Sequence, residues 1–273
     1  MRGYHVLQGS DENTILSNLD GVGSLKCLTN TANICLAAKA LHPEIIIVYR
    51  SLVTNDGLRD GPSLVEWSNP DIYYASLRPH LVPGFDYYEF INEWSAPSPK
   101  IEADFNIRML TLLERDGMRG LAFSFAPGQV SLQNWLEDIR VLQWIDQHPQ
   151  HGIAVHQTGM LPDSVQTLPD SYIRNTYITQ RLEYVDAYLE AIHGYDLHDF
   201  NGVIVVSEMG WTNYTAPDQA FSCDQVRAGI RVTENFYRNS GLVDFYNLWN
   251  FGSAGNHWVD LSSCLPFQVT SDR

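Results

Sequence analysis

Basic residues are scarce in this chain. Its 17 lysines and arginines stand against 32 aspartates and glutamates, which gives a formal net charge of −15 at pH 7. Nucleic acids and anionic membrane surfaces are bound through clusters of Lys and Arg, so we expect neither as a partner. A polyanionic substrate would need a local basic pocket that overrides the global charge.

Long apolar runs are also missing. No stretch approaches the roughly 20 apolar residues that span a bilayer. The opening segment, MRGYHVLQGS, lacks the apolar region of a secretory signal. We therefore expect a soluble protein without a signal peptide in this chain, and its compartment, cytoplasmic or secreted after processing, stays open.

Several ligand-binding motifs are absent as well. No phosphate loop of the form GxGxxG or GxxxxGK[ST] follows an apolar run, and there is no HxH, HExxH or CxxC. The sequence therefore predicts no metal and no cofactor. Cys27 and Cys35 fall in an expected strand and helix, whereas Cys223 and Cys264 fall in expected loops and can pair only if those loops meet. The disulfide state and the oligomeric state stay open.

What the chain does have is material for a large core, with 44% hydrophobic residues, 7 Trp and 14 Tyr. Apolar runs of strand length alternate with amphipathic stretches, without a linker or composition shift. The expected strands are Tyr4–Gln8, Ser24–Leu28, Glu44–Leu52, Phe85–Trp94, Gly120–Ala126, Gly152–Gln157, Gly202–Ser207 and Val243–Trp249. The expected helices are Glu12–Leu19, Thr31–Leu41, Ser63–Leu81, Lys100–Asp116, Leu132–Gln147, Ile178–Ile192 and Asp224–Asn239.

Strict alternation of β and α segments implies a parallel sheet. Eight such units in about 250 residues fit a (β/α)8 TIM barrel, here a single domain over residues 1–273. An open doubly wound sheet is the alternative, and the missing phosphate loop argues against it. After Trp249 the sequence offers only a short closing segment or a truncated last unit.

Two of the expected strands end in the same way. The run FDYYEFINEW ends on Asn92-Glu93-Trp94, and the run GVIVVSEMGW carries Glu208 just after its β-branched residues. A carboxyl group at the end of a buried strand lies where desolvation can raise its pKa, although an ordinary solvated loop glutamate is the alternative. Barrel active sites lie at the carboxyl ends of the strands, so both glutamates should face one pocket. Two facing carboxylates suit glycoside hydrolysis.

Further candidate residues stand at or near the same strand ends. Each also has a plain structural alternative: a histidine satisfied by its neighbours, an arginine in an ion pair with Glu93 or Glu208, or a tryptophan that only packs. The candidates for substrate binding are Arg50, Asn92, Trp94, His156, Trp211 and Trp249.

Asn-Glu at the end of strand four together with Glu at the end of strand seven resembles the clan A glycoside hydrolases, which are retaining (β/α)8 enzymes. The resemblance covers nearly the whole chain in element order and is carried by the short motifs INEW and VVSEMGW. It implies that Glu93 is the acid/base and Glu208 the nucleophile. It also implies that Asn92 binds the sugar 2-hydroxyl, that Trp249 floors the subsite of the attacked sugar, and that His156 lies near the nucleophile.

The resemblance therefore implies a hydrolase of carbohydrate metabolism that acts by double displacement on a neutral, β-linked glycan. One departure stands out: where the clan often has an arginine after strand two, this chain has Lys26 and Asn30, and Arg50 is the candidate substitute. The alternative is a catalytically inactive barrel that binds carbohydrate or a protein partner. A third reading is a barrel enzyme that uses one of the two glutamates as a general base on a carbonyl substrate. The sugar, the linkage and endo or exo action are not set by the sequence.

Overall fold

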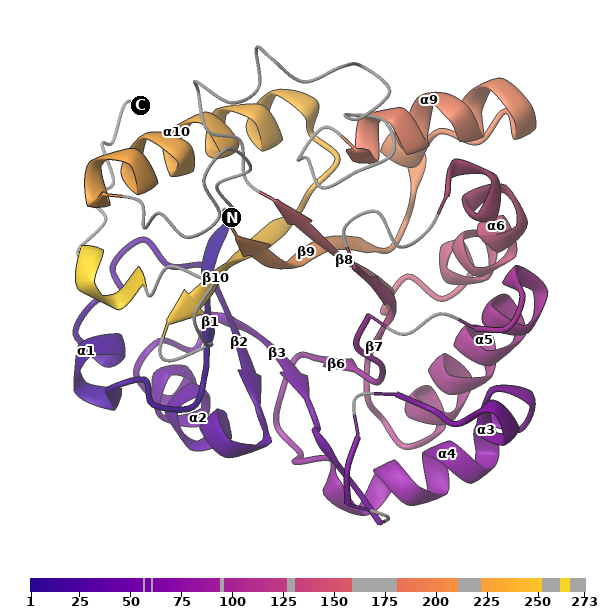
Figure 1. Ribbon diagram of the computed structural model, residues 1–273, viewed down its shortest axis with the longest axis horizontal. Helices are drawn as coiled ribbons and strands as arrows, with labels where there is room; N and C mark the ends of the chain where they lie inside the picture. The colour runs from indigo at the N-terminus through magenta and orange to yellow at the C-terminus, as the bar shows by residue number, and fades with distance from the viewer. Residues whose placement is uncertain are drawn as a thin grey trace.

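The computed structural model describes residues 1–55, 57–59, 61–93, 96–126, 131–158, 181–210, 222–251 and 261–265. Its eight parallel strands close into a barrel in the order β1-β10-β9-β8-β7-β6-β3-β2, ringed by helices (Figure 1). The predicted (β/α)8 fold is therefore confirmed. The barrel strands are β1 (Arg2–Val6), β2 (Ser24–Leu28), β3 (Ile46–Arg50), β6 (Tyr87–Glu89), β7 (Gly120–Phe125), β8 (Gly152–Thr158), β9 (Val203–Gly210) and β10 (Phe245–Phe251).

The helices follow the predicted segments closely. The α-helices are α1 (Glu12–Leu16), α2 (Ala32–Leu41), α3 (Leu64–Ser68), α4 (Pro70–Leu77), α5 (Pro99–Arg115), α6 (Leu132–Asp146), α9 (Arg181–His193) and α10 (Cys223–Ser240). The described residues also form four short 3-10 helices, η1 (Thr29–Thr31), η2 (Arg78–His80), η3 (Leu197–Asp199) and η4 (Leu261–Cys264). Among these described helices, none is both long and apolar enough to cross a membrane.

Local chemistry explains where the helices begin and break. The side chain of Asp11 accepts a hydrogen bond from the Thr14 backbone N–H at 2.9 Å, which caps α1. The expected helix over Ser63–Leu81 is divided at Asn69 because Pro70 has no N–H to donate and begins a new helix.

Two strand ends near the candidate glutamates and one hairpin differ from the prediction. Strand β6 ends at Glu89, so Glu93 lies four residues beyond it rather than at the end of a strand over Phe85–Trp94. Glu93 has φ 51°, in the left-handed region, where a strand ladder cannot continue. Strand β9 is longer than expected and contains Glu208. A hairpin of β4 (Val53–Thr54) and β5 (Gly57–Leu58) went unpredicted, because two-residue strands carry no periodicity.

The barrel interior begins with an apolar layer. Its side chains are almost wholly buried and come from six of the eight strands, so they plug the barrel rather than line a pore. They are Val48, Tyr87, Leu121, Ala154, Val205 and Phe245. A separate, larger cluster fills the space between the strands and the helices.

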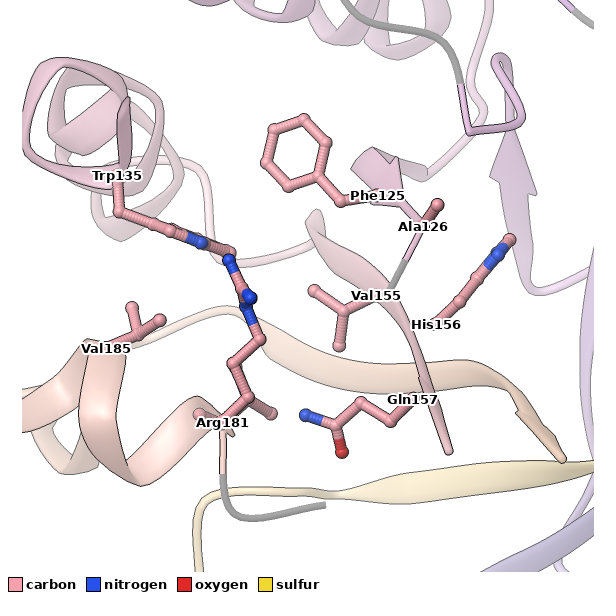
Figure 2. A pocket seen from close by; sticks show the side chains of 9 residues that line it. Phe125, Ala126, Trp135, Val155, His156, Gln157, Arg181 and Val185 are labelled. Atoms are coloured by element: carbon pink, nitrogen blue, oxygen red, sulfur yellow. The ribbon is translucent and has the colours of Figure 1, made fainter. Parts of the chain in front are cut away.

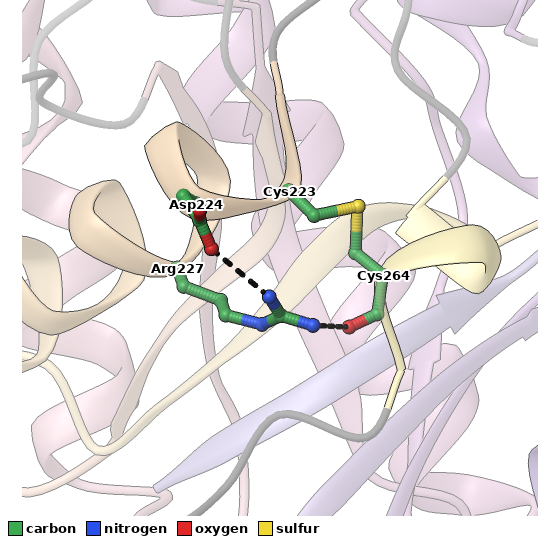
Figure 3. The surroundings of a disulfide bond; sticks show 4 residues. All are labelled: Cys223, Asp224, Arg227 and Cys264. Carbon is green, nitrogen blue, oxygen red and sulfur yellow. Dashed lines mark hydrogen bonds and ion pairs between the residues drawn. A yellow bond between two sulfur atoms is a disulfide. The ribbon is translucent and has the colours of Figure 1, made fainter.

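A disulfide ties the 3-10 helix η4 to the helix α10. Cys223 begins α10 and Cys264 lies in η4, and their sulfur atoms are bonded (Figure 3). Arg227 supports the link, because its guanidinium donates to the Cys264 carbonyl at 3.1 Å and to Asp224 at 3.2 Å. Cys223 and Cys264 therefore do pair, although they lie in helices rather than in the expected loops, while Cys27 and Cys35 stay free and buried.

Candidate active site

A charged layer lies directly above the apolar layer of the barrel interior. Side chains alternate between the two faces of a strand, so a residue two positions beyond an interior residue also points inward. Arg50, Glu89 and His156 stand two positions beyond Val48, Tyr87 and Ala154, and Lys26 joins them from β2. All four polar side chains are buried, with Lys26 and Glu89 at 0% exposure.

Glu208 is held at the centre of this layer. Its Oε1 lies 2.9 Å from Lys26 Nζ and 3.0 Å from Arg50 Nη1. The same oxygen is 3.7 Å from His5 Nδ1, and Oε2 is 3.7 Å from His156 Nδ1. Lys26 and Arg50 thus both engage one carboxylate oxygen, whereas His156 approaches the other.

These neighbours fix the charge on Glu208. Burial by itself would raise the pKa of the Glu208 carboxyl, but His156, Lys26 and Arg50 together hold that pKa well below its ordinary value. His5 is fully buried beside it, and desolvation lowers the pKa of this imidazole well below its usual range. Glu208 is therefore a carboxylate at neutral pH and His5 is neutral.

Glu93 reaches the same place from the segment after β6. Its left-handed backbone is fixed by a hydrogen bond from Glu93 N–H to the Ser124 carbonyl, at 3.0 Å. Ser124 and Phe123 also have positive φ, at an irregularity in the pairing of β7 with β8. Unfavourable backbone of this kind persists where the surroundings over-determine it, and it is concentrated at functional sites. The side chain of Glu93 is 40% exposed and its Oε1 lies 2.7 Å from His156 Nδ1.

The two candidate carboxyl groups lie close together. Glu93, His156 and Glu208 each offer one polar atom within 4.8 Å of the others. Such spacing also suits a metal ion, but Lys26 and Arg50 already neutralise Glu208, and a divalent cation would compete with both. A pair of carboxyl groups about 5 to 5.5 Å apart is the arrangement that retaining glycosidases use.

The structure adds residues that the sequence did not single out as functional. Lys26 lies 2.6 Å from Glu89 and thus bridges that carboxylate to Glu208. Burial would raise the pKa of Glu89, but Lys26 and Arg50 lower it. A charged residue within a buried apolar strand was the available signal for Lys26 and Glu89. His5 offered the same signal in β1.

The remaining candidates fall into two groups. Asn92 accepts a hydrogen bond from Arg50 Nη1, which ties the residue before Glu93 to the charged layer. Trp249 packs edge-on against His5, with ring centroids 4.6 Å apart, so it contacts a neighbour of Glu208. Trp94 and Trp211 lie outside the described residues.

Comparison with known proteins places the fold. No family model and no curated protein matches the sequence. Among solved structures, the barrel is similar to the catalytic domain of a GH26 endo-β-1,4-mannanase from Bacillus sp. JAMB-750, with a TM-score of 0.56, 13% identity, and 97% of this chain and 81% of that chain covered. It is also similar to the endo-β-1,4-glucanase Xac0029 from Xanthomonas axonopodis pv. citri, with a TM-score of 0.54, 12% identity, and 94% and 91% covered.

A family 5 xyloglucanase from Paenibacillus pabuli gives a TM-score of 0.53 at 10% identity, with 96% of this chain and 94% of that chain covered. At such low identities these likenesses establish the fold alone. The chain therefore has a barrel of the kind that glycoside hydrolases use, and the resemblance to the clan A enzymes is confirmed at the level of the fold.

Proposed function

We propose that this protein is a retaining glycoside hydrolase that acts on a neutral, β-linked glycan. The observation that carries the proposal is the approach of Glu93 and Glu208, whose carboxyl oxygens come within 4.8 Å of each other above the barrel core. This spacing agrees with a double displacement and leaves too little room for the water that an inverting enzyme places between its carboxylates.

In the first step Glu208 attacks the anomeric carbon and the glycosidic C–O bond breaks. The leaving oxygen takes the bond's electron pair and a proton from Glu93, and a glycosyl ester of Glu208 forms. The cations at Oε1 of Glu208 support this role, because they keep the group ionised while Oε2 remains the attacking atom.

In the second step Glu93, now a carboxylate, takes a proton from water. The water oxygen attacks the anomeric carbon, the ester bond breaks, and the sugar leaves with its original configuration. His156 supports the change of role, because its Nδ1 lies 2.7 Å from Glu93 Oε1 and can hydrogen-bond to either protonation state of that carboxyl group.

The substrate class follows from charge and from the similar structures. A net charge of −15 disfavours an anionic polysaccharide. Trp249, which packs on His5 next to Glu208, is an indole of the kind that stacks against the apolar face of a sugar ring. The neighbours in fold are named as a mannanase, a glucanase and a xyloglucanase, which supports a β-linked glycan. The proposed chemistry needs no cofactor.

A second candidate is a catalytically inactive barrel that binds carbohydrate or a protein partner. It is favoured by Lys26, which stands where the clan often has an arginine and forms ion pairs with both Glu89 and Glu208. This reading predicts binding without turnover.

A panel of β-glucans, β-mannans, xyloglucan and xylans, assayed for new reducing ends, tests the proposal. The wild-type protein should cleave at least one of them with retention, as observed by NMR of the first product anomer. Glu208→Gln should be inactive, and Glu44→Gln, on the surface, should match the wild type. Binding of a glycan without turnover would instead establish the second candidate.

A further inference from the structure

A small cavity lies behind the candidate active site, between the ends of β7 and β8 and the helices α6 and α9 (Figure 2). It offers about 10 Å³ to the centre of a water-sized sphere. That is room for one water molecule or one monatomic ion, and not for phosphate or a carboxylic acid. Its apolar lining includes Phe125, Val155, Leu182 and Val185.

The polar side-chain groups that face this cavity are hydrogen-bond donors. Figure 2 shows the guanidinium of Arg181 rising from the start of α9 toward the indole nitrogen of Trp135. The amide nitrogen of Gln157 turns to the same side, because its oxygen accepts a hydrogen bond from the Tyr237 hydroxyl at 2.6 Å. The side chain of His156 points away from the cavity.

Arg181 is a buried cation without a counter-ion among the described residues. It is 8% exposed, and both its Nη1 and the Nε1 of Trp135 are buried without a hydrogen-bond partner in the described part of the chain. Burial lowers the pKa of Arg181, and no neighbouring charge among the described residues offsets that effect. Burying a charge is costly unless it is paired, so this arrangement calls for an anion.

A single water molecule would not provide this counter-charge. A water molecule could accept from two of the donors, but its own hydrogens would then face the remaining donors or apolar carbon.

We propose that this cavity binds a single halide ion, chloride under ordinary conditions, held by Arg181, the indole N–H of Trp135 and the amide of Gln157. The ion supplies the missing counter-charge and fixes the start of α9 against β8. This site is distinct from the carboxylate pair and does not depend on the proposed glycosidase activity.

Thermal unfolding at constant ionic strength tests the proposal, with sodium gluconate replaced stepwise by sodium chloride or bromide. The melting temperature should rise by about 3 °C for each tenfold increase in halide above the dissociation constant. Arg140→Gln, which breaks an exposed ion pair with Asp104, serves as the control for general salt effects and should keep the response.

Two variants sharpen the result. Trp135→Phe keeps the ring and removes one donor, so it should weaken the halide response. Gln157→Glu places a fixed carboxylate in the cavity, so it should abolish the response and raise the melting temperature in gluconate. Bromide-soaked crystals should give an anomalous peak beside Arg181. A response that survives Gln157→Glu, the lack of any response in the wild type, or bromide found only on the surface would overturn the proposal.

Discussion

Two regions of this barrel bury carboxyl groups, and the pKa values of these groups are shifted in opposite directions. On the barrel axis, the pKa values of Glu89 and Glu208 are lowered although both groups are buried. Between α5 and α6, burial raises the pKa of Glu102 to about 7 and that of Asp138 to about 8. Depth is similar in the two places, so depth does not decide the charge.

The difference lies in the cations. Lys26 lies within 2.9 Å of carboxylate oxygens of both axial glutamates, and Arg50 lies 3.0 Å from Glu208. Both carboxylate oxygens of Asp138 are buried without a hydrogen-bond partner among the described residues. In a chain with only 17 basic residues, two buried cations at one point mark a place where negative charge is needed.

The largest effect that would sharpen this comparison is on catalysis. Glu208→Gln keeps the shape but removes the proposed nucleophile, and kcat should fall by at least about 10⁴-fold. Glu93→Gln should cost about 10²- to 10⁴-fold, as loss of a general acid does, with less loss on substrates whose leaving group needs no proton. Steady-state kinetics of both variants, on an aryl glycoside and on a glycan that the wild type cleaves, separates the nucleophile from the acid/base. Equal losses on both substrates for Glu93→Gln would contradict the acid/base assignment.

The next effect is on stability. Lys26→Met leaves Glu89 fully buried without its closest cation, and the free energy of unfolding should fall by about 3 to 5 kcal/mol. The double variant Lys26→Met with Glu89→Gln restores the charge balance of the layer and should recover part of that loss. Urea unfolding measures both, with the exposed Lys100→Met as the matched control. A single variant as stable as the control would show that the axial charges do not need Lys26.

The pH dependence of that loss has a definite sign. The pKa values of Glu89 and Glu208 are lower in the folded state, so their contribution to stability is present above the unfolded value of about 4.3 and is lost as the pH falls through the folded values. In Lys26→Met the pKa values of the folded glutamates move back toward the unfolded value. The free energy of unfolding of this variant should therefore fall less than that of the wild type as the pH is lowered.

The contrast also explains what the sequence could and could not predict. Periodicity located the eight strands, because apolar runs of strand length alternate with amphipathic helices. The paired motifs led to Glu93 and Glu208. The end of β6 was missed, since the backbone turns at Glu93 through a hydrogen bond to Ser124, a contact between segments far apart in sequence. The bridging role of Lys26 depends on strands β2, β6 and β9 meeting at the axis, and the local sequence does not contain that information.

A third substitution acts on the carboxyl groups between α5 and α6, whose pKa values are raised by burial. Asp138→Asn replaces a carboxyl group that is protonated when folded and ionised when unfolded near neutral pH. A raised folded pKa means that stability is lost as the pH rises from about 4 toward the folded value of about 8. The variant should therefore be about as stable as the wild type near pH 4 and more stable by a few kcal/mol at pH 8. Urea unfolding across this range measures the gap. A gap that does not grow with pH would mean that Asp138 is ionised in the folded protein.

The smallest effect concerns the coupling between Asp138 and Glu102. Like charges disfavour each other's ionisation, and the nearby Glu102 adds to the raised pKa of Asp138. At pH 6 both groups are protonated in the folded state and should not interact. At pH 9 a double-mutant cycle of Asp138→Asn and Glu102→Gln should give a coupling of about 1 kcal/mol, so that either substitution removes much of the gain from the other. The same coupling at both pH values would point to packing rather than charge as its source. Only the raised pKa of Asp138 itself would then remain as the contrast to the lowered pKa values of Glu89 and Glu208.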